Sequence, residues 1–336
     1  MSAEEEQAPS CRPAAAMADP PPPVHGMRQW TGLMFGPAAL LATLLLPVPA
    51  GLSPAGWHTA GVALLMAIFW ISEAIPIPTT ALLPLVLFPL LGLGDIRETA
   101  TPYAHPIVFL FLGGFIIALA MQRCHLHRRI AINLLGVMGT QPKHIIAGFL
   151  LASALVSMWV SNTATAMMML PIALSVVQLI PGDSPGERNF AAALVLAVAY
   201  GATTGGMGTL IGTPPNALLA AYLSKIYHTE IGFGQWMLLG VPVVLVTLPV
   251  VYLILTRVSF KLDSGELPGF TDLLAREKSG LGRISRTEKI VTAVFALTAL
   301  GWIGQPLLAR VAPLITDTTI GITGALLLFF IPVNAR

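Results

Sequence analysis

Long apolar runs separated by short polar segments fill the chain from about residue 30 onward. Most of them reach or approach the ~20 residues that a helix needs to cross a bilayer. We expect membrane-spanning helices at residues 30–47, 57–75, a third segment ending near residue 94, 106–121, 190–223, 234–256, 290–308 and 318–331. The pattern predicts an all-α polytopic membrane protein.

One apolar run, residues 145–180, is too long for an ordinary span and carries three polar residues, Ser161, Asn162 and Thr163, in its middle. It is either one overlong span or a re-entrant hairpin of two half-helices. The hairpin keeps the seven Lys and Arg residues of the polar linker, residues 257–289, on the same side as most other basic residues. A single crossing would move the linker to the opposite side and remove this excess of basic residues on one side. The positive-inside rule therefore favours the hairpin, with a cytoplasmic N-terminus.

A second interruption lies at residues 203–216, where glycine and proline are too dense for a continuous helix. In lipid, a broken helix survives only where its freed backbone groups are buried in protein or line a polar cavity. Two interrupted segments in one chain are typical of the binding site of a secondary transporter.

The composition excludes several other classes of protein. Of 336 residues, 55% are hydrophobic and 10% are charged, against about 25% charged residues in soluble domains. The net charge of +2 and the absence of a basic patch with interleaved aromatics argue against nucleic-acid binding. The two cysteines fit no metal spacing, and the chain has no metalloprotease or serine-hydrolase motif, so we do not expect an enzyme.

Apart from Glu73, the expected spans carry no charged side chain in their interiors. A site here must work through hydroxyls, amides and helix ends. A helix N-terminus suits an anion, and unwound carbonyls suit Na⁺. Ser161 and Asn162 offer oxygens to a cation, Asn162 and Thr163 offer donors to an anion, and Ser157 lies one turn before Ser161. The pattern predicts Na⁺ and a small anion in one pocket; helix packing through small residues is the alternative.

Three other polar residues receive structural interpretations. Glu73 lies near the end of its helix, where a capping or structural role competes with a functional one. His125 and His127 flank a basic patch and are expected to be solvated at the membrane interface.

Several short motifs resemble the divalent anion/sodium symporter family. They are I-S-E-A-I-P at 71–76, T-A-L-L-P at 80–84, F-L-F-L-G-G-F at 109–115, L-H-R-R-I-A at 126–131, S-N-T at 161–163 and I-G-T-P-P-N at 211–216. The resemblance runs from about Trp30 to the end. It implies two inverted repeats, each with a re-entrant hairpin tipped by Ser-Asn-Thr and a broken transmembrane helix, working as a dimer by elevator motion. Family members couple Na⁺ to uptake of dicarboxylates, citrate or sulfate.

The resemblance also implies roles for single residues. A sodium site would use Ser157, Ser161, Asn162 and the backbone of Gly212, and the substrate carboxylate would touch Asn162 and Thr163. The residues implied to support this site are Thr213, Pro214, Pro215 and Asn216. In the family, the Pro-Pro-Asn version of the 211–216 motif resembles carboxylate carriers more than sulfate carriers. The resemblance therefore favours a succinate-like or malate-like substrate, with sulfate as the alternative.

The sequence contains Ser-Asn-Thr once, so we expect the second repeat that the resemblance implies to be largely missing. The expected parts are a disordered cytoplasmic tail (1–28), scaffold helices (29–141), a transport-type region (142–256), a cytoplasmic linker (257–289) and two helices of the second repeat (290–336). We expect a Na⁺-coupled di- or tricarboxylate symporter in the plasma (inner) membrane, as a homodimer in the lipid bilayer. The alternative is a truncated, transport-incompetent half-transporter that needs a partner.

Overall fold

The structure, a computed structural model, describes residues 26–180, 182, 184–262 and 265–331. Within these ranges all regular secondary structure is helical, as predicted. Most of the expected N-terminal tail lies outside the described residues. The chain divides into two compact units, one ending at Ala104 and one beginning at His105.

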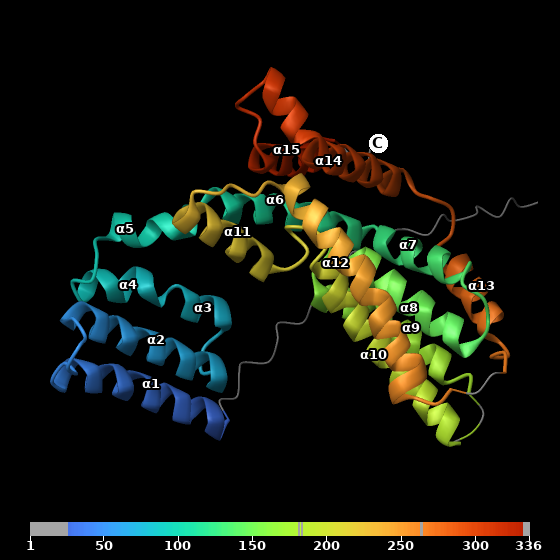
Figure 1. The fold of residues 1–336 in the computed structure, drawn as a ribbon, viewed down its shortest axis with the longest axis horizontal. Helices are drawn as coiled ribbons and strands as arrows, with labels where there is room; N and C mark the ends of the chain where they lie inside the picture. The colour runs from blue at the N-terminus through green and yellow to red at the C-terminus, as the bar shows by residue number, and fades with distance from the viewer. Residues whose placement is uncertain (1–25, 181, 183, 263–264, 332–336) are drawn as a thin grey trace, which may run out of the picture. The chain divides into compact units, whose positions relative to one another are not determined.

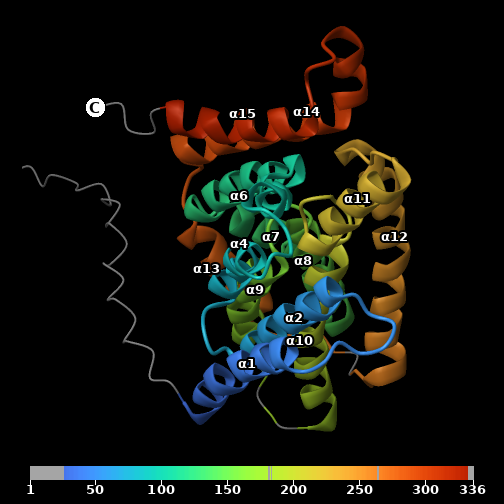
Figure 2. The ribbon, with the colours of Figure 1, turned by 90° about the vertical axis from the view of Figure 1, so that its left-hand side faces the viewer.

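The first unit contains the helices α1 (Met27–Leu45), α2 (Pro54–Ser72), α3 (Ile77–Ala81), α4 (Leu83–Leu90) and α5 (Ile96–Ala100), and the 3-10 turn Thr101–Ala104. Helices α1 and α2 lie side by side (Figure 2). Gly32 of α1 packs against Ser72 of α2, and Gly61 of α2 packs against Thr43 of α1. Small residues at both ends of the contact let the two backbones approach closely.

The expected third span is shorter than predicted. A turn at Leu82 separates α3 from α4, and α4 ends at Leu90 rather than near residue 94. Pro84 and Pro89 lack the N–H that would continue the helical ladder. Glu73 caps the C-terminus of α2 in a left-handed conformation (φ 52°), with its carboxylate 3.3 Å from Arg28.

The second unit contains the longer helices and the interrupted segments (Figure 1). Its elements are α6 (Pro106–Arg123), α7 (Leu126–Leu135), α8 (Pro142–Ser157), α9 (Asn162–Val177), α10 (Pro185–Gly206), α11 (Pro214–Tyr227), α12 (Phe233–Leu253) with the π-helical turns Ile254–Ser259, α13 (Phe270–Gly280), α14 (Arg286–Val311) and α15 (Asp317–Phe330).

Five helices of the described chain are long and apolar enough to cross a membrane. They are Pro54–Ser72, Pro106–Arg123, Pro185–Gly206, Phe233–Ser259 and Arg286–Val311. Helices α8, α9 and α15 are apolar but shorter, at 14 to 16 residues. The long run 145–180 is therefore two short apolar helices, not one overlong span.

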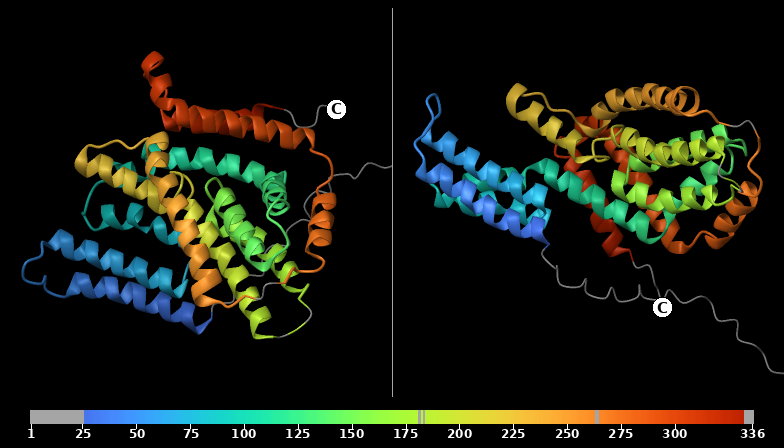
Figure 3. Two further views of the ribbon diagram at one scale, coloured as in Figure 1. Left: turned by 45° about the vertical axis from the view of Figure 1, so that its right-hand side comes forward. Right: turned by 90° about the horizontal axis from the view of Figure 1, so that it is seen from below.

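Helices α8, α9 and α10 lie together in this unit (green to yellow-green in Figure 3) and supply much of its main cluster of buried apolar residues. On α10, Gly201 rests against the carbonyl of Leu150 and Gly205 rests against that of Ala154, both in α8. A Cβ at either glycine would overlap the α8 backbone. The glycines therefore set how closely α10 approaches the helix that leads to the Ser-Asn-Thr segment.

The N-terminus of α12 is fixed by α14 and α15. The backbone N–H of Phe233 donates to Asp317 Oδ2 at 2.6 Å, which caps α12 with a carboxylate. The Phe233 ring stacks on Trp302 with 4.5 Å between centroids, and the Trp302 indole N–H donates to the Asp317 carbonyl at 2.9 Å. These contacts join the end of the linker between α11 and α12 to the α14–α15 pair.

The expected polar linker contains a helix, α13, which was not predicted because the segment is rich in charged residues. Phe270 and Leu274, one turn apart, are both buried and face the core around α8 to α10. Just before α13, the Leu267 N–H donates to the Thr140 carbonyl at 3.0 Å. The linker therefore packs against the segment from which α8 begins.

Candidate functional site

The Ser-Asn-Thr segment forms the tip between two antiparallel helices. Helix α8 ends at Ser157 and α9 begins at Asn162. Ser161 is the N-cap of α9, and its Oγ accepts the Ala164 N–H at 3.3 Å. The Ser161 hydroxyl satisfies the Ala164 N–H and leaves the N–H groups of Asn162 and Thr163 without an acceptor from the helix.

The far ends of this helix pair lie together. Before α8, the Thr140 carbonyl accepts from Leu267. After α9, the Leu179 side chain contacts Gly269, which carries a positive φ of 81°. Both ends therefore meet the same stretch of linker. This is the arrangement that a hairpin entering and leaving on one side requires.

The second interruption lies where it was expected. Helix α10 ends at Gly206 and α11 begins at Pro214, so residues 207–213 are not α-helical. Pro214 and Pro215 occupy the first turn of α11 and donate no N–H there. Asn216 is buried, and its amide donates to the carbonyls of Gly206 (2.9 Å) and Thr209 (2.8 Å).

The hairpin tip and the break meet. Ser157, fully buried, donates its hydroxyl to Asn162 Oδ1 at 2.6 Å. A Cβ on Gly206 would overlap that same Oδ1, and a Cβ on Gly212 would overlap the Gly206 carbonyl. The structure thus brings together two of the side-chain oxygens predicted to bind sodium and the backbone of Gly212.

The remaining predicted residues surround this point. Ser161 and Asn162 are half-buried, and Thr163 is exposed in the first turn of α9. Thr213 is half-buried in an extended conformation before α11, and the two prolines after it are exposed. Ser157 therefore lies on the buried side of the tip, Thr163 lies on its open side, and Ser161 and Asn162 lie between them.

Thr209 and Trp236 also belong to the site, although neither was predicted. The Thr209 hydroxyl donates to the Met158 carbonyl in the hairpin turn and accepts the Gly212 N–H at 3.1 Å. The Trp236 indole N–H on α12 donates to the Met207 carbonyl at 3.0 Å. The threonine lies inside the glycine-rich break, and that position was the only signal for it.

The chemistry of the site is that of neutral oxygens and a helix end. Hard cations prefer oxygen ligands, and unwound carbonyls near a half-helix suit Na⁺. The N–H groups of Asn162 and Thr163 lie in the first turn of α9, where the helix itself supplies no acceptor. A carboxylate placed there meets the positive end of the helix dipole.

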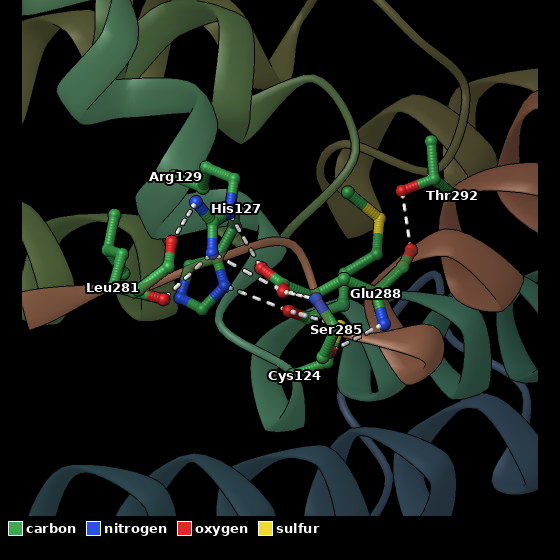
Figure 4. Close-up of polar contacts among 9 residues, drawn as sticks. Cys124, His127, Arg129, Leu281, Ser285, Glu288 and Thr292 are labelled. Carbon is green, nitrogen blue, oxygen red and sulfur yellow. Dashed lines mark hydrogen bonds and ion pairs between the residues drawn. The ribbon is translucent and has the colours of Figure 1, made fainter. Parts of the chain in front are cut away.

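A charged cluster elsewhere in this unit has a structural role (Figure 4). Arg129 on α7 pairs with Glu288 on α14 through Nε–Oε1 (2.7 Å) and Nη2–Oε2 (3.3 Å). It also donates to the carbonyls of Leu281 (2.9 Å) and Gly282 (3.1 Å). Glu288 in turn accepts the Ser285 N–H at 2.6 Å. Each ionic group here is neutralised by another, so the cluster anchors helices.

His127 corrects the expectation that both histidines are solvated. His125 is exposed, but His127 is 7% exposed and its Nδ1 lies 3.1 Å from the Met121 carbonyl. Burial lowers the pKa of the His127 imidazole from its ordinary value near 6.5, and the nearby charges of His125 and Arg128 lower it further. The hydrogen bond with the Met121 carbonyl raises this pKa and offsets part of the decrease. The amphipathic face of α7 explains the difference, because it turns His127 inward with Leu126 and Ala131.

Comparison with known proteins places this chain in a family. Residues 66–335 match the family model CitMHS, described as a citrate transporter. The chain is 41% identical over 321 residues to the sodium-dependent dicarboxylate transporter SdcS of Staphylococcus saprophyticus, covering 93% of this chain and 62% of that relative. It is 39% identical over 313 residues to SdcS of Staphylococcus aureus strain USA300, covering 90% of this chain and 60% of the relative.

The chain thus spans about three fifths of the length of these relatives. Their names confirm the resemblance to sodium-coupled anion transporters that the short motifs indicated. The family is one of transporters, not of enzymes, as the sequence predicted. The chain belongs to the citrate transporter family CitMHS.

Proposed function

We propose that this chain carries a sodium site and a carboxylate site of a Na⁺-coupled symporter for di- or tricarboxylates of the succinate or malate type. The observation that carries the proposal is the meeting of the hairpin tip with the α10–α11 break. There Ser157 and Asn162 place two neutral oxygens 2.6 Å apart beside Gly206 and Gly212. The similar transporters are named sodium-dependent dicarboxylate transporters, which agrees with both ligands.

In this proposal the buried side of the tip binds the cation. The Ser157 and Asn162 oxygens are close enough to contact one ion, with Ser161 and the Gly212 backbone completing the shell. The open side, with Asn162 and Thr163 at the start of α9, binds one substrate carboxylate. Each ligand then screens the charge of the other, which explains how a site without charged side chains binds both.

The proposal extends to the arrangement in the membrane. The pair α8–α9 acts as the re-entrant hairpin, α10–α11 as the broken helix, and α14–α15 as the first helices of a second inverted repeat. The N-terminus is cytoplasmic, the membrane is the plasma (inner) membrane, and the assembly is a homodimer. Residues 29–141 serve as scaffold, residues 142–256 move with the substrate, and residues 257–289 link the two repeats.

Uptake by the purified chain in liposomes tests the proposal. An inward Na⁺ gradient is expected to drive accumulation of radiolabelled succinate, and replacing Na⁺ with choline abolishes it. Asn162→Ala, which removes a group from both ligand shells, is expected to lose uptake, whereas the exposed linker variant Arg283→Ala keeps it. Equal uptake with Na⁺ and choline would refute sodium coupling, and accumulation of sulfate in preference to succinate would reassign the substrate.

A half-transporter that needs a partner is the second candidate. The residues of this chain contain Ser-Asn-Thr once and cover 62% of the S. saprophyticus transporter, so they supply one of the two hairpin tips that the resemblance implies. This candidate predicts that the chain binds ²²Na⁺ but does not take up succinate alone. Robust uptake by the chain alone excludes this candidate.

A further inference from the structure

The seven residues between α10 and α11 carry backbone groups that no helix satisfies, yet most of this stretch is buried. A loose loop at this place could not hold Gly212 at a fixed distance from the hairpin tip. Three side chains bond to these groups: Thr209 within the break, Asn216 after it and Trp236 on α12. Thr209 bonds the break to the hairpin, and Asn216 bonds it to the first turn of α11.

Thr209 connects the break to the hairpin. Its side chain is fully buried, and its hydroxyl makes both kinds of hydrogen bond at once. As a donor it meets the carbonyl of Met158, the residue directly after Ser157. As an acceptor it holds the N–H of Gly212 at 3.1 Å. One hydroxyl group therefore connects the two segments that supply the proposed sodium ligands.

Asn216 holds the break from the other side. Its amide donates to the Gly206 carbonyl at 2.9 Å and to the Thr209 carbonyl at 2.8 Å. Gly206 is the residue against which Asn162 Oδ1 lies. Asn216, in the first turn of α11, thus fixes both Gly206, which packs on Asn162, and the backbone of Thr209.

We propose that Thr209 is the positioning residue of the sodium site: its hydroxyl sets Na⁺ affinity by holding Gly212 against the hairpin turn at Met158. The inference rests on the proposed function, because it assumes that sodium binds where tip and break meet. Valine has nearly the shape of threonine but neither donates nor accepts. It removes the donor to the Met158 carbonyl and leaves the Gly212 N–H with only the longer bond to the Thr209 carbonyl (3.3 Å), so Gly212 is held less firmly against the hairpin.

Equilibrium binding of ²²Na⁺ to the purified full chain tests the inference. Thr209→Val is expected to raise the apparent Kd for Na⁺ about tenfold, the effect of losing a buried hydrogen bond, with the binding capacity unchanged. Thr209→Ser, which keeps the hydroxyl, is expected to restore the affinity. Thr203→Val is the matched control, because Thr203 lies in the last turns of α10 just before the break but is exposed, and it is expected to bind as the wild type does.

The outcomes separate this inference from the proposed function. Wild-type protein that binds no ²²Na⁺ overturns both. Sodium binding that Thr209→Val leaves unchanged overturns the positioning role alone, as does a Thr209→Ser variant as weak as the valine variant. If the valine variant does not fold, Thr209→Ala removes the hydroxyl without adding bulk, and the same tenfold loss with serine rescue is expected.

Discussion

The Arg129–Glu288 pair gives a sharp test of what holds α7 to α14, because the chain supplies its own control. Arg129 and Glu288 are 14% and 5% exposed in their side chains, and Arg129 makes four hydrogen bonds. The neighbouring Arg128 makes a chemically similar pair with Glu277 at 2.5 Å, but those side chains are 40% and 21% exposed. The two pairs differ mainly in burial.

Burial decides the expected magnitudes. Removing one partner of a buried pair leaves an uncompensated charge and costs about 3–5 kcal/mol, whereas a pair in contact with solvent contributes about 0–1 kcal/mol. Arg129→Ala is therefore expected to lower the free energy of unfolding by about 3 kcal/mol or more, since two carbonyls also lose their donors. Arg128→Ala is expected to lower it by less than about 1 kcal/mol.

Denaturant titration in mild detergent micelles, followed by circular dichroism, measures both variants on one scale. A second substitution sharpens the test. Glu288→Gln in the Arg129→Ala background removes the stranded charge while keeping an acceptor for Ser285, so the double variant is expected to be more stable than Arg129→Ala alone. Equal losses for the two arginine variants, or a double variant whose loss equals the sum of the single losses, would contradict the reasoning.

Three further predictions concern the same unit. Gly205→Ala places a methyl group into the carbonyl of Ala154, so the thermal midpoint of the purified protein is expected to fall by several degrees, while Gly280→Ala, which meets open space, leaves it unchanged. Asp317→Ala removes the carboxylate cap of α12 and is expected to cost about 1 kcal/mol in the same denaturant titration, with Asp317→Asn retaining most of the stability. Because burial lowers the pKa of His127, the unfolded chain takes up the proton at a higher pH than the folded chain does. The free energy of unfolding is therefore expected to fall as pH drops below about 6.5 and to level off below the folded pKa. His127→Gln is expected to make the free energy of unfolding less dependent on pH in this range.

The two interruptions could be predicted from local sequence because each one breaks a local rule. Three polar residues in an apolar run, and glycine and proline in a helix, are unfavourable wherever they occur in lipid. Their meeting in space was implied only by family resemblance. The bond that joins them, from Thr209 to Met158, spans 51 residues of chain. No pattern within either segment indicates which carbonyl this hydroxyl meets.

Charge misled the sequence interpretation at two places. The basic patch around Arg128 suggested that His127 is solvated, but the periodicity of α7 turns that one position inward. The linker has many basic residues, yet Phe270 and Leu274 at helical spacing were enough to fold α13 onto the core. In both cases the apolar period decided the structure, and the charged neighbours took the exposed positions.

Close packing through small residues was the competing interpretation of the polar cluster, and the two units of this chain show where that interpretation suffices. Between α1 and α2, Gly32 and Gly61 bring two backbones together while both helices stay continuous. Between α8 and α10, Gly205 does the same, but one residue further on the helix unwinds for seven residues. Packing alone gives no reason to give up those helical hydrogen bonds at membrane depth. An unwound segment held by buried side chains next to a pair of neutral oxygens is the feature on which the proposed binding site rests.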